Sequence, residues 1–309
     1  MSMKELYKYI TGILLLLVGA SLTHKNRDKI ILCLVTAGLF ISLLAIYQYF
    51  FGFQRLLGYI SKQGITDPFV LDYVSRKRVF FPFVTPNILG GYLAMIIPLT
   101  LTYNNRIWLI TLLSFALLLT QSIGGLLSLF LGLAIYFYLL RTFTKLRGLQ
   151  GKSEKRRVIF LFALLMIIVF VLTIRSLTQK QHIQPVFSTI MRLNYWKDTL
   201  SIIKASPWFG VGVGNFNLTE SRFAHNSYLQ IWAEMGILGI ISILWLIIAA
   251  FKSALKNMRN SSHKSQNATI TTAGAVFLIH NLVDFSFFLP EVAIIWWMIF
   301  GLIISKDSE

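Results

Sequence analysis

A histidine at the head of a polar stripe is the part of this sequence whose residue types and spacing best suit chemistry. His225 directly precedes Asn226, and Gln230 and Glu234 follow at every fourth position of a run that is otherwise apolar. On a helix this spacing places Asn226, Gln230 and Glu234 on one face. A carboxylate within a membrane segment is costly and faces a protein interior or a wet cavity. A lone histidine is more often structural, but one that opens a buried polar stripe after a cationic loop fits a functional role equally well, so we take His225 as a candidate functional residue.

Basic residues that suit an anion lie earlier in the chain. Arg192 precedes Trp196 by one turn of an amphipathic stretch at 188–204. Arginine suits phosphate because its planar guanidinium donates two parallel hydrogen bonds. Arg76, Lys77 and Arg78 form a second basic group, for which the charge spacing favours neither an anion site nor a solvated cationic loop.

Three other polar segments are more typical of a structural role than of a catalytic or binding role. The run from Gly210 to Gly214 has glycine at alternate positions, but it lacks the spacing of a nucleotide-binding loop, so we prefer a sharp turn to an anion-binding nest. The segment 120–125 is typical of a hairpin turn. His280 and Asp284, with Asn281 between them, are interpreted as polar contacts that join helices. No metal-ligand motif is present in the sequence, and a single cysteine excludes a disulfide framework.

Membrane helices must position these residues. The chain is 56% hydrophobic and 13% charged, with a mean hydropathy of +0.68, whereas a soluble domain is about 45–50% apolar. This composition excludes a large soluble enzyme domain. It predicts an all-α, polytopic protein with about nine spans in one integral membrane domain, residues 1–309. The predicted spans are 7–22, 30–50, 87–103, 107–122, 124–141, 158–174, 226–251, 268–288 and 291–305. The first of these also fits a secretory signal peptide.

The net charge of +17 indicates an orientation. If the short basic loop at 142–157 is cytoplasmic, 16 of the 29 Lys and Arg residues lie inside, in short segments where the positive-inside rule applies. The other 13 lie outside, mostly in the long segments 51–86 and 175–225, the latter being a large external loop between spans six and seven. An anionic ligand and anionic lipid head groups both account for this external excess.

The order of these motifs over about residues 75–300 resembles the O-antigen ligase and polymerase family of bacterial envelope enzymes. The matching elements are Arg78 ahead of Phe83-x-x-Pro86-Asn87, Thr120-Gln121-Ser122, Arg192-x-x-x-Trp196, Pro207-x-x-Gly210-x-Gly212-x-Gly214-x-Phe216, His225-Asn226-x-x-Leu229, Glu234-x-Gly236 and His280-Asn281-x-x-Asp284. Each element is weak by itself, and their order carries the resemblance.

This resemblance implies a GT-C-like glycosyltransferase of lipopolysaccharide-type biosynthesis. Such an enzyme moves a glycan from undecaprenyl diphosphate or a similar polyprenyl diphosphate carrier to a glycan, lipid or protein acceptor. It works at the periplasmic face of the bacterial inner membrane, among membrane lipids, with no cofactor, metal or nucleic acid. The resemblance assigns diphosphate binding to Arg192 and the acceptor hydroxyl to His225. The remaining candidate substrate-binding residues are Arg78, Asn87, Lys197, Arg222, Asn226 and Glu234.

One departure from the family pattern affects this expectation. Ile123 stands where the family has a diphosphate-binding arginine, and isoleucine cannot bind phosphate. Either Arg78, Lys197 or Arg222 replaces that cation, or activity is altered or absent. A transporter or flippase for a lipid-linked glycan and an inactive scaffold are therefore the alternative functions. The sequence does not choose between ligase and polymerase.

Overall fold

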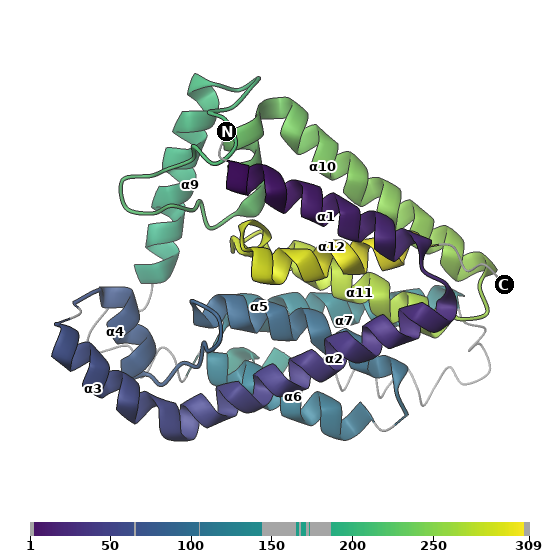
Figure 1. Ribbon diagram of the computed structural model, residues 1–309, viewed down its shortest axis with the longest axis horizontal. Helices are drawn as coiled ribbons and strands as arrows, with labels where there is room; N and C mark the ends of the chain where they lie inside the picture. Colours follow the sequence, from purple (N-terminus) through teal and green to yellow (C-terminus); the bar gives the residue numbers. More distant parts are fainter. Residues whose placement is uncertain are drawn as a thin grey trace.

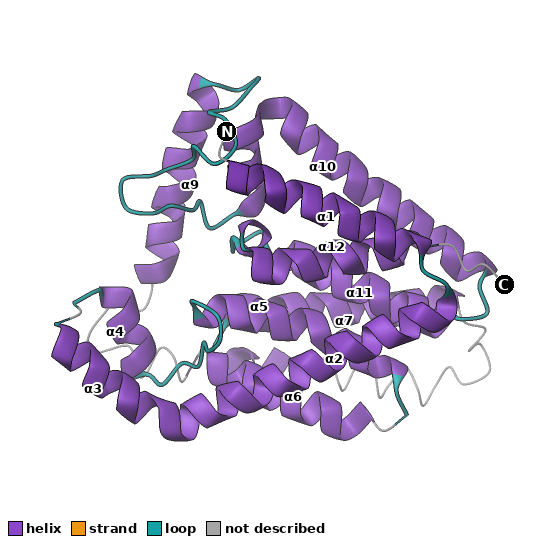
Figure 2. Cartoon of the chain, in the orientation of Figure 1, coloured by secondary structure: helices purple, strands orange, loops and turns teal. Residues whose placement is uncertain are grey.

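The computed structural model describes residues 3–64, 66–104, 106–143, 165–166, 168–170, 173 and 187–305. Within these ranges the chain forms helices and loops and no strand, which confirms the predicted all-α class (Figure 2). Most of the predicted loop at 142–157, most of the predicted span at 158–174 and the first part of the predicted external loop, up to residue 186, lie outside the described residues.

The helices follow the apolar runs. Their bounds are α1 Met3–Ser21, α2 His24–Tyr47, α3 Phe53–Gln63, α4 Pro68–Ser75, α5 Pro86–Ile96, α6 Arg106–Thr120, α7 Ile123–Phe143, α9 Phe187–Ala205, α10 Ser227–Asn260, α11 Lys264–His280 and α12 Pro290–Ile304, with a π-helical turn η1 at Gln48–Gly52 and 3₁₀ turns η2 at Ile97–Thr102 and η5 at Ser286–Phe288. Among the described residues, three helical stretches are long and apolar enough to span a membrane: His24–Gln63, Ile123–Phe143 and Ser227–Asn260. Shorter apolar helices lie at Pro86–Thr102, Arg106–Thr120 and Pro290–Ile304, and the count of nine spans stays a prediction.

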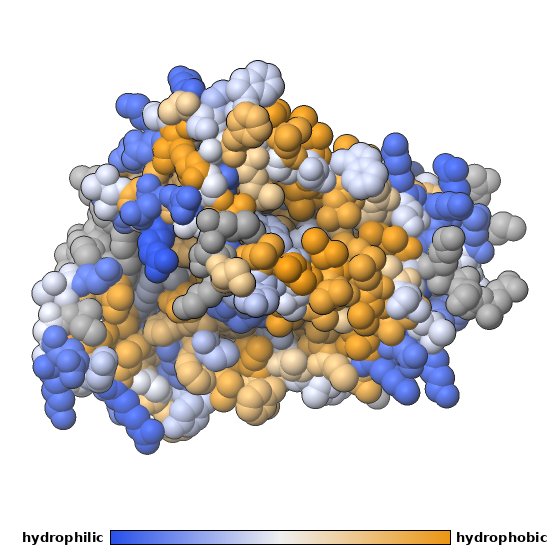
Figure 3. Space-filling view, turned by 45° about the horizontal axis from the view of Figure 1, so that its top comes forward, coloured by the Kyte–Doolittle hydropathy of each residue, from blue (hydrophilic) through white to orange (hydrophobic). Residues whose placement is uncertain are grey.

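The helices form a bundle with α5, α7 and α11 packed together at its centre (Figure 1). On one side α2 and α6 cover α5, and on the other α12 and α10 cover α11, with α1 lying along α12. Hydrophobic residues occupy the middle of the surface in Figure 3, while hydrophilic residues gather towards both ends. This distribution suits a bundle whose middle lies in lipid and whose ends lie in water.

Close helix packing at the centre depends on glycine. Gly91 of α5 leaves room for the His280 imidazole of α11, which a side chain at position 91 would overlap. α5 begins close to the start of the predicted span at 87–103, because Pro86 occupies its first turn and the Thr85 hydroxyl accepts a hydrogen bond from the Ile88 amide at 3.3 Å. α5 therefore begins at a fixed point beside the end of α6.

One predicted span is too long. The apolar run at 268–288 predicts one helix, but α11 ends at His280. The chain then turns. The Asp284 carboxylate accepts hydrogen bonds from the amides of Phe285 and Ser286, at 2.8 and 3.1 Å, so these amides do not donate to the preceding turn of a continued helix, and η5 begins at Ser286. The turn brings Asp284 to the end of the bundle where α10 begins.

Candidate functional site

Five side chains from distant parts of the chain gather at the end of the bundle that carries α4, α9 and the start of α10 (Figure 1). This site cluster consists of Tyr73 on α4, Arg78 just after it, Arg192 on α9, His225 just before α10 and Asp284 after α11. The charges of Arg192 and Asp284 act on both His225 and Tyr73, and Arg78 acts on Tyr73. The two residues expected to be catalytic, Arg192 and His225, are thus neighbours.

Arg192 is half-buried on the side of α9 that faces the cluster. It makes no hydrogen bond or ion pair with any residue that the structure describes. Its guanidinium therefore keeps its donors for a ligand. Tyr195, one turn further along α9, stacks on His225 with a centroid distance of 5.5 Å, so the helix that carries Arg192 also supports the histidine.

Aromatic packing fixes the His225 ring. Besides stacking on Tyr195, the imidazole meets Phe285 edge-on, with a centroid distance of 4.7 Å and an interplanar angle of 86°. The backbone of His225 has a φ of 52°, which is uncommon for a residue other than glycine. Its Nδ1 is buried and has no hydrogen-bond partner within the described residues. The ring is thus oriented by aromatic packing and not by a hydrogen bond from Nδ1 to a described residue.

The pKa of His225 suits a base more than an acid. Burial lowers this pKa to about 4; the charge of Asp284 opposes the shift, and the charge of Arg192 adds to it. The imidazole is consequently neutral at pH 7 and able to accept a proton.

The guanidinium of Arg78, unlike that of Arg192, is hydrogen-bonded to neighbouring residues that the structure describes. It is 2% exposed, and its Nε donates to the Thr120 carbonyl at 3.1 Å while one Nη donates to Asn87 Oδ1 at 3.0 Å. The other Nη lies 3.9 Å from the Asp72 carboxylate. Arg78 therefore joins the loop after α4 to the start of α5 and the end of α6. It lies against the turn that leads to Ile123, the half-buried first residue of α7.

Asp284 is buried and well supplied with donors. In addition to the two amides that start η5, its Oδ1 accepts from the Ser286 hydroxyl at 2.7 Å. Its Oδ2 lies 3.7 Å from His280 Nε2. Asn281 accepts a hydrogen bond from the Ser227 hydroxyl at 2.7 Å. The polar residues at the end of α11 therefore join this helix to α10, as interpreted from the sequence.

Asn226 caps α10. Its side-chain oxygen accepts hydrogen bonds from the amides of Tyr228 and Leu229, at 3.0 and 3.1 Å. This arrangement satisfies two of the free amides at the helix start and sets the position of the preceding His225.

Gln230 and Glu234 of the predicted stripe are buried, and they bind the protein's own backbone. Gln230 accepts from the Ala224 amide at 3.1 Å and donates to Glu234 at 2.9 Å. The other Glu234 oxygen accepts from the Gly214 amide at 3.0 Å. The stripe therefore anchors the segment before His225 and the glycine-rich loop against α10.

The glycine-rich loop is a turn, as preferred from the sequence. Gly210, Gly212 and Gly214 have φ values of 67°, 96° and 78°. The amides of Val211 and Gly212 donate to carbonyls of α10, and the Gly214 amide donates to Glu234. These three amides are thus not available to cradle a phosphate.

Two predicted substrate-binding residues lie apart from these contacts. Lys197 on α9 and Arg222 in the following loop are exposed, and neither side chain makes a hydrogen bond or ion pair within the described part of the chain. Conversely, Tyr73 was not predicted. Its signal in the sequence was weak, an aromatic residue five positions before Arg78, and only the tertiary fold brings α4 to the cluster.

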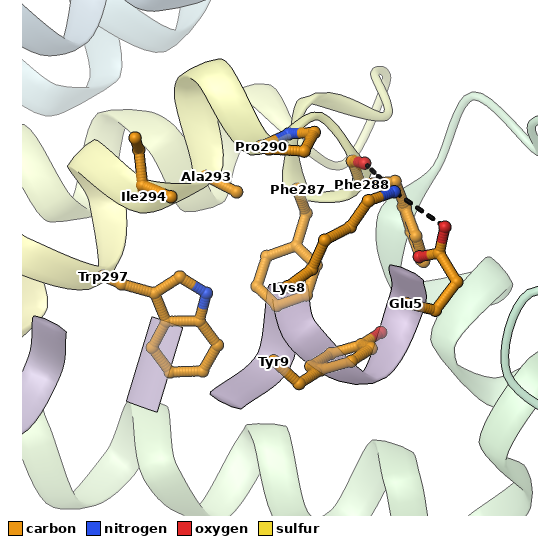
Figure 4. A pocket seen from close by; sticks show the side chains of 9 residues that line it. All are labelled: Glu5, Lys8, Tyr9, Phe287, Phe288, Pro290, Ala293, Ile294 and Trp297. Atoms are coloured by element: carbon orange, nitrogen blue, oxygen red, sulfur yellow. Dashed lines mark hydrogen bonds and ion pairs between the residues drawn. The ribbon is translucent and has the colours of Figure 1, made fainter. Parts of the chain in front are cut away.

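No group of three His, Cys, Asp or Glu side chains within the described ranges is arranged to hold a metal ion. A pocket with an empty volume of about 370 Å³, which includes space open to the surroundings, lies between α1 and α12 and is bordered by η5 (Figure 4). Its walls are mostly apolar, and Lys8 at its edge contacts Glu5 and the Phe288 carbonyl. No member of the site cluster lines this pocket.

Comparison with known proteins relates part of the chain to a family. Residues 108–244 match the family model described as O-antigen ligase, and this range contains Ile123, Arg192 and His225. A segment of the chain is 24% identical over 110 residues to an uncharacterized protein of Haemophilus influenzae, covering 31% of this chain and about a quarter (27%) of that relative. No solved structure matches. Residues 108–244 are therefore similar to the O-antigen ligase family, which confirms the resemblance carried by the order of the motifs.

Proposed function

We propose that this protein is a membrane glycosyltransferase that moves a glycan from a polyprenyl diphosphate carrier to an acceptor hydroxyl at the outer face of the bacterial cytoplasmic membrane. The family match supports the general activity. The observation that carries the finer assignment is the pairing of Arg192, which has no partner among the described residues, with a neutral His225 beside it. Together they offer an anion-binding cation and a base in one place.

The cation acts on the leaving group. As the bond between the sugar and the diphosphate breaks, negative charge develops on the diphosphate oxygen. The Arg192 guanidinium stabilises that charge through hydrogen bonds that strengthen as the charge grows. Removal of one such donor commonly costs 10²–10³ in rate.

The base acts on the acceptor. His225 takes the proton of the acceptor hydroxyl while the acceptor oxygen forms a bond to the anomeric carbon. The bound diphosphate offsets the charge of Arg192, so the pKa of His225 rises from about 4 towards a value better matched to proton transfer. The charge of Asp284 stabilises the imidazolium that results.

The other candidate residues support this pair. Arg78, held by Asn87, supplies positive charge beside the turn where Ile123 replaces the family arginine. Lys197 and Arg222 on the exposed rim attract the anionic donor at longer range. We assign Asn226 and Glu234 to positioning, because their oxygens already accept backbone hydrogen bonds.

Product formation tests this proposal. Purified full-length protein is incubated with a polyprenyl diphosphate glycan and an acceptor, and the parent is compared with His225→Ala and Arg192→Ala. Each variant should lose activity by about 100-fold or more. Lys204→Ala is the matched control, since Lys204 is an exposed cation on the same helix as Arg192.

Three results would contradict the proposal. If both variants retain parental activity, the site assignment is wrong. If the parent moves the donor between leaflets without forming product, the protein is a transporter, and if it binds the donor without either reaction, it is a scaffold.

A further inference from the structure

We propose that the Tyr73 hydroxyl is a second direct ligand of the donor's diphosphate, opposite Arg192. This inference rests on the proposed function and deepens it, because it names a further group that touches the substrate. Tyr73 lies on α4, outside the range of the family match at 108–244. Neither the family match nor the motif order assigns it a role.

The Tyr73 ring covers Arg78. The Arg78 guanidinium carbon lies 5.1 Å from the ring centroid, which is a cation–π distance, and the Arg78 amide donates to the Tyr73 carbonyl at 2.8 Å. Arg78 itself is 2% exposed, whereas Tyr73 is only half-buried. A ligand that approaches this wall of the cluster therefore meets the tyrosine before it meets the guanidinium.

The Tyr73 hydroxyl is without a hydrogen-bond partner in the part of the chain that the structure describes. It is not among the fully enclosed polar atoms. By contrast, the hydroxyl of Tyr228 on α10 donates to the Leu278 carbonyl at 2.9 Å. A partly buried phenol without a protein partner is available to bind a ligand.

The charges around Tyr73 favour an anion there. Burial raises the pKa of the Tyr73 hydroxyl, and the positive charges of Arg78 and Arg192 lower this pKa by less. The charges of Asp284 and Asp67 add to the rise. Tyr73 thus keeps its proton at neutral pH and can donate it in a hydrogen bond to a phosphate oxygen.

The side chain at position 123 offers no contact to an anion on this wall, because Ile123 is apolar. Arg78 lies near the same turn but is enclosed and hydrogen-bonded to Thr120 and Asn87. The hydroxyl of the ring that covers Arg78 is therefore a donor that a ligand can use at this wall in place of the enclosed guanidinium.

Ligand binding by the full-length protein in detergent tests this inference. The probe is farnesyl diphosphate, and farnesol, which has the same chain without the charge, is the comparison. Tyr73→Phe keeps the ring over Arg78 and removes only the hydroxyl. It should weaken farnesyl diphosphate binding about tenfold, the usual effect of one lost hydrogen bond to a charged group, and leave farnesol binding unchanged. The control is Tyr59→Phe, because Tyr59 is 57% exposed on the neighbouring α3.

The variants separate failure of the inference from failure of the proposed function. If Arg192→Ala weakens farnesyl diphosphate binding and Tyr73→Phe does not, the inference is wrong and the proposed function stands. If Tyr73→Phe weakens farnesol binding to the same extent as farnesyl diphosphate binding, the hydroxyl has a structural role and the inference is also wrong. The same conclusion follows if Tyr73→Phe lowers the melting temperature of the protein by several degrees while Tyr59→Phe does not. If neither Arg192→Ala nor Tyr73→Phe affects binding, the diphosphate site itself is wrong.

Discussion

Arg78 and Arg192 carry the same charge at one site, yet their surroundings give them different roles. Arg78 donates to Thr120 and Asn87 and lies near Asp72, whereas Arg192 has no partner among the described residues. A partly neutralised, enclosed guanidinium stabilises the wall of a site, and an unpaired one attracts a ligand. The motif order predicted that both arginines belong to the site, but only the contacts separate their roles.

The titration of His225 is the first test at this scale. In the free protein, NMR of labelled histidine should give His225 a pKa near 4, well below the usual 6.5, because burial disfavours the charged ring. Arg192→Gln should raise this pKa, since it removes a neighbouring positive charge, and Asp284→Asn should lower it. His225→Gln identifies the signal by its loss. A midpoint near 6.5 in the parent would contradict the neutral, buried ring described above.

Ile123→Arg tests whether a cation at position 123 strengthens diphosphate binding. Ile123 is the first residue of α7, where the helix dipole favours an anion. An arginine here should tighten farnesyl diphosphate binding several-fold, and the gain should shrink at high salt because the new contact is partly open to water. Ile123→Met, which adds no charge, is the control. Equal affinities for Ile123→Arg and Ile123→Met would show that position 123 does not face the ligand.

At the scale of elements, a kink in α10 seats the glycine-rich loop. Gly236 has a φ of 66° within the helix, and the Trp208 carbonyl packs directly against it. The Ile237 amide donates to the Pro207 carbonyl at 3.0 Å across the same contact. The kink therefore holds the segment between Arg192 on α9 and His225 at the start of α10, although neither residue contacts Gly236 in the structure.

Gly236→Ala should disturb the site from a distance. A side chain at 236 would overlap the Trp208 carbonyl and would also be strained at positive φ, so we expect a cost of at least about 2 kcal/mol in stability and a loss of transfer activity. Gly64→Ala is a matched control: Gly64 has a φ of 62° but has no atom within 4 Å of the added carbon. It should cost only about 1 kcal/mol and spare activity. Similar melting temperatures and activities for the two variants would argue against the kink as a support of the site.

The sequence pattern predicted where helices start better than it predicted which groups their side chains contact. The apolar run at 87–103 predicted where α5 begins, and the spacing of Gln230 and Glu234 predicted a buried stripe. The groups that satisfy the stripe, the amides of Ala224 and Gly214, lie in loops that periodicity does not describe. The end of α11 was misplaced for the same reason, because hydropathy shows that residues 281–288 are largely apolar but not that the chain turns at Asp284. Tyr73 joins the site only through the tertiary position of α4.

At the scale of the whole molecule, hydrophilic residues gather towards two ends that a hydrophobic middle separates (Figure 3). The site cluster lies at the end that carries α4 and α9, and the last turns of α10 lie at the other (Figure 1). The part of α10 that follows the kink at Gly236, residues 237–260, is about 36 Å long, which exceeds the roughly 30 Å of a bilayer core. Its two ends consequently reach opposite aqueous phases if it spans.

Cysteine labelling in intact cells tests which phase the site faces. The native Cys33 is exposed on α2 and is first replaced by serine. Lys204→Cys places a thiol on exposed α9 at the site end, and Lys256→Cys places one near the far end of α10. A reagent that does not cross the cytoplasmic membrane should label position 204 in cells and position 256 only after the membrane is opened, because the density of Lys and Arg in short segments marks the far end as cytoplasmic. The reverse pattern would place the site inside the cell, where the proposed outer-face transfer cannot occur, and labelling of both positions in intact cells would mean that α10 does not span.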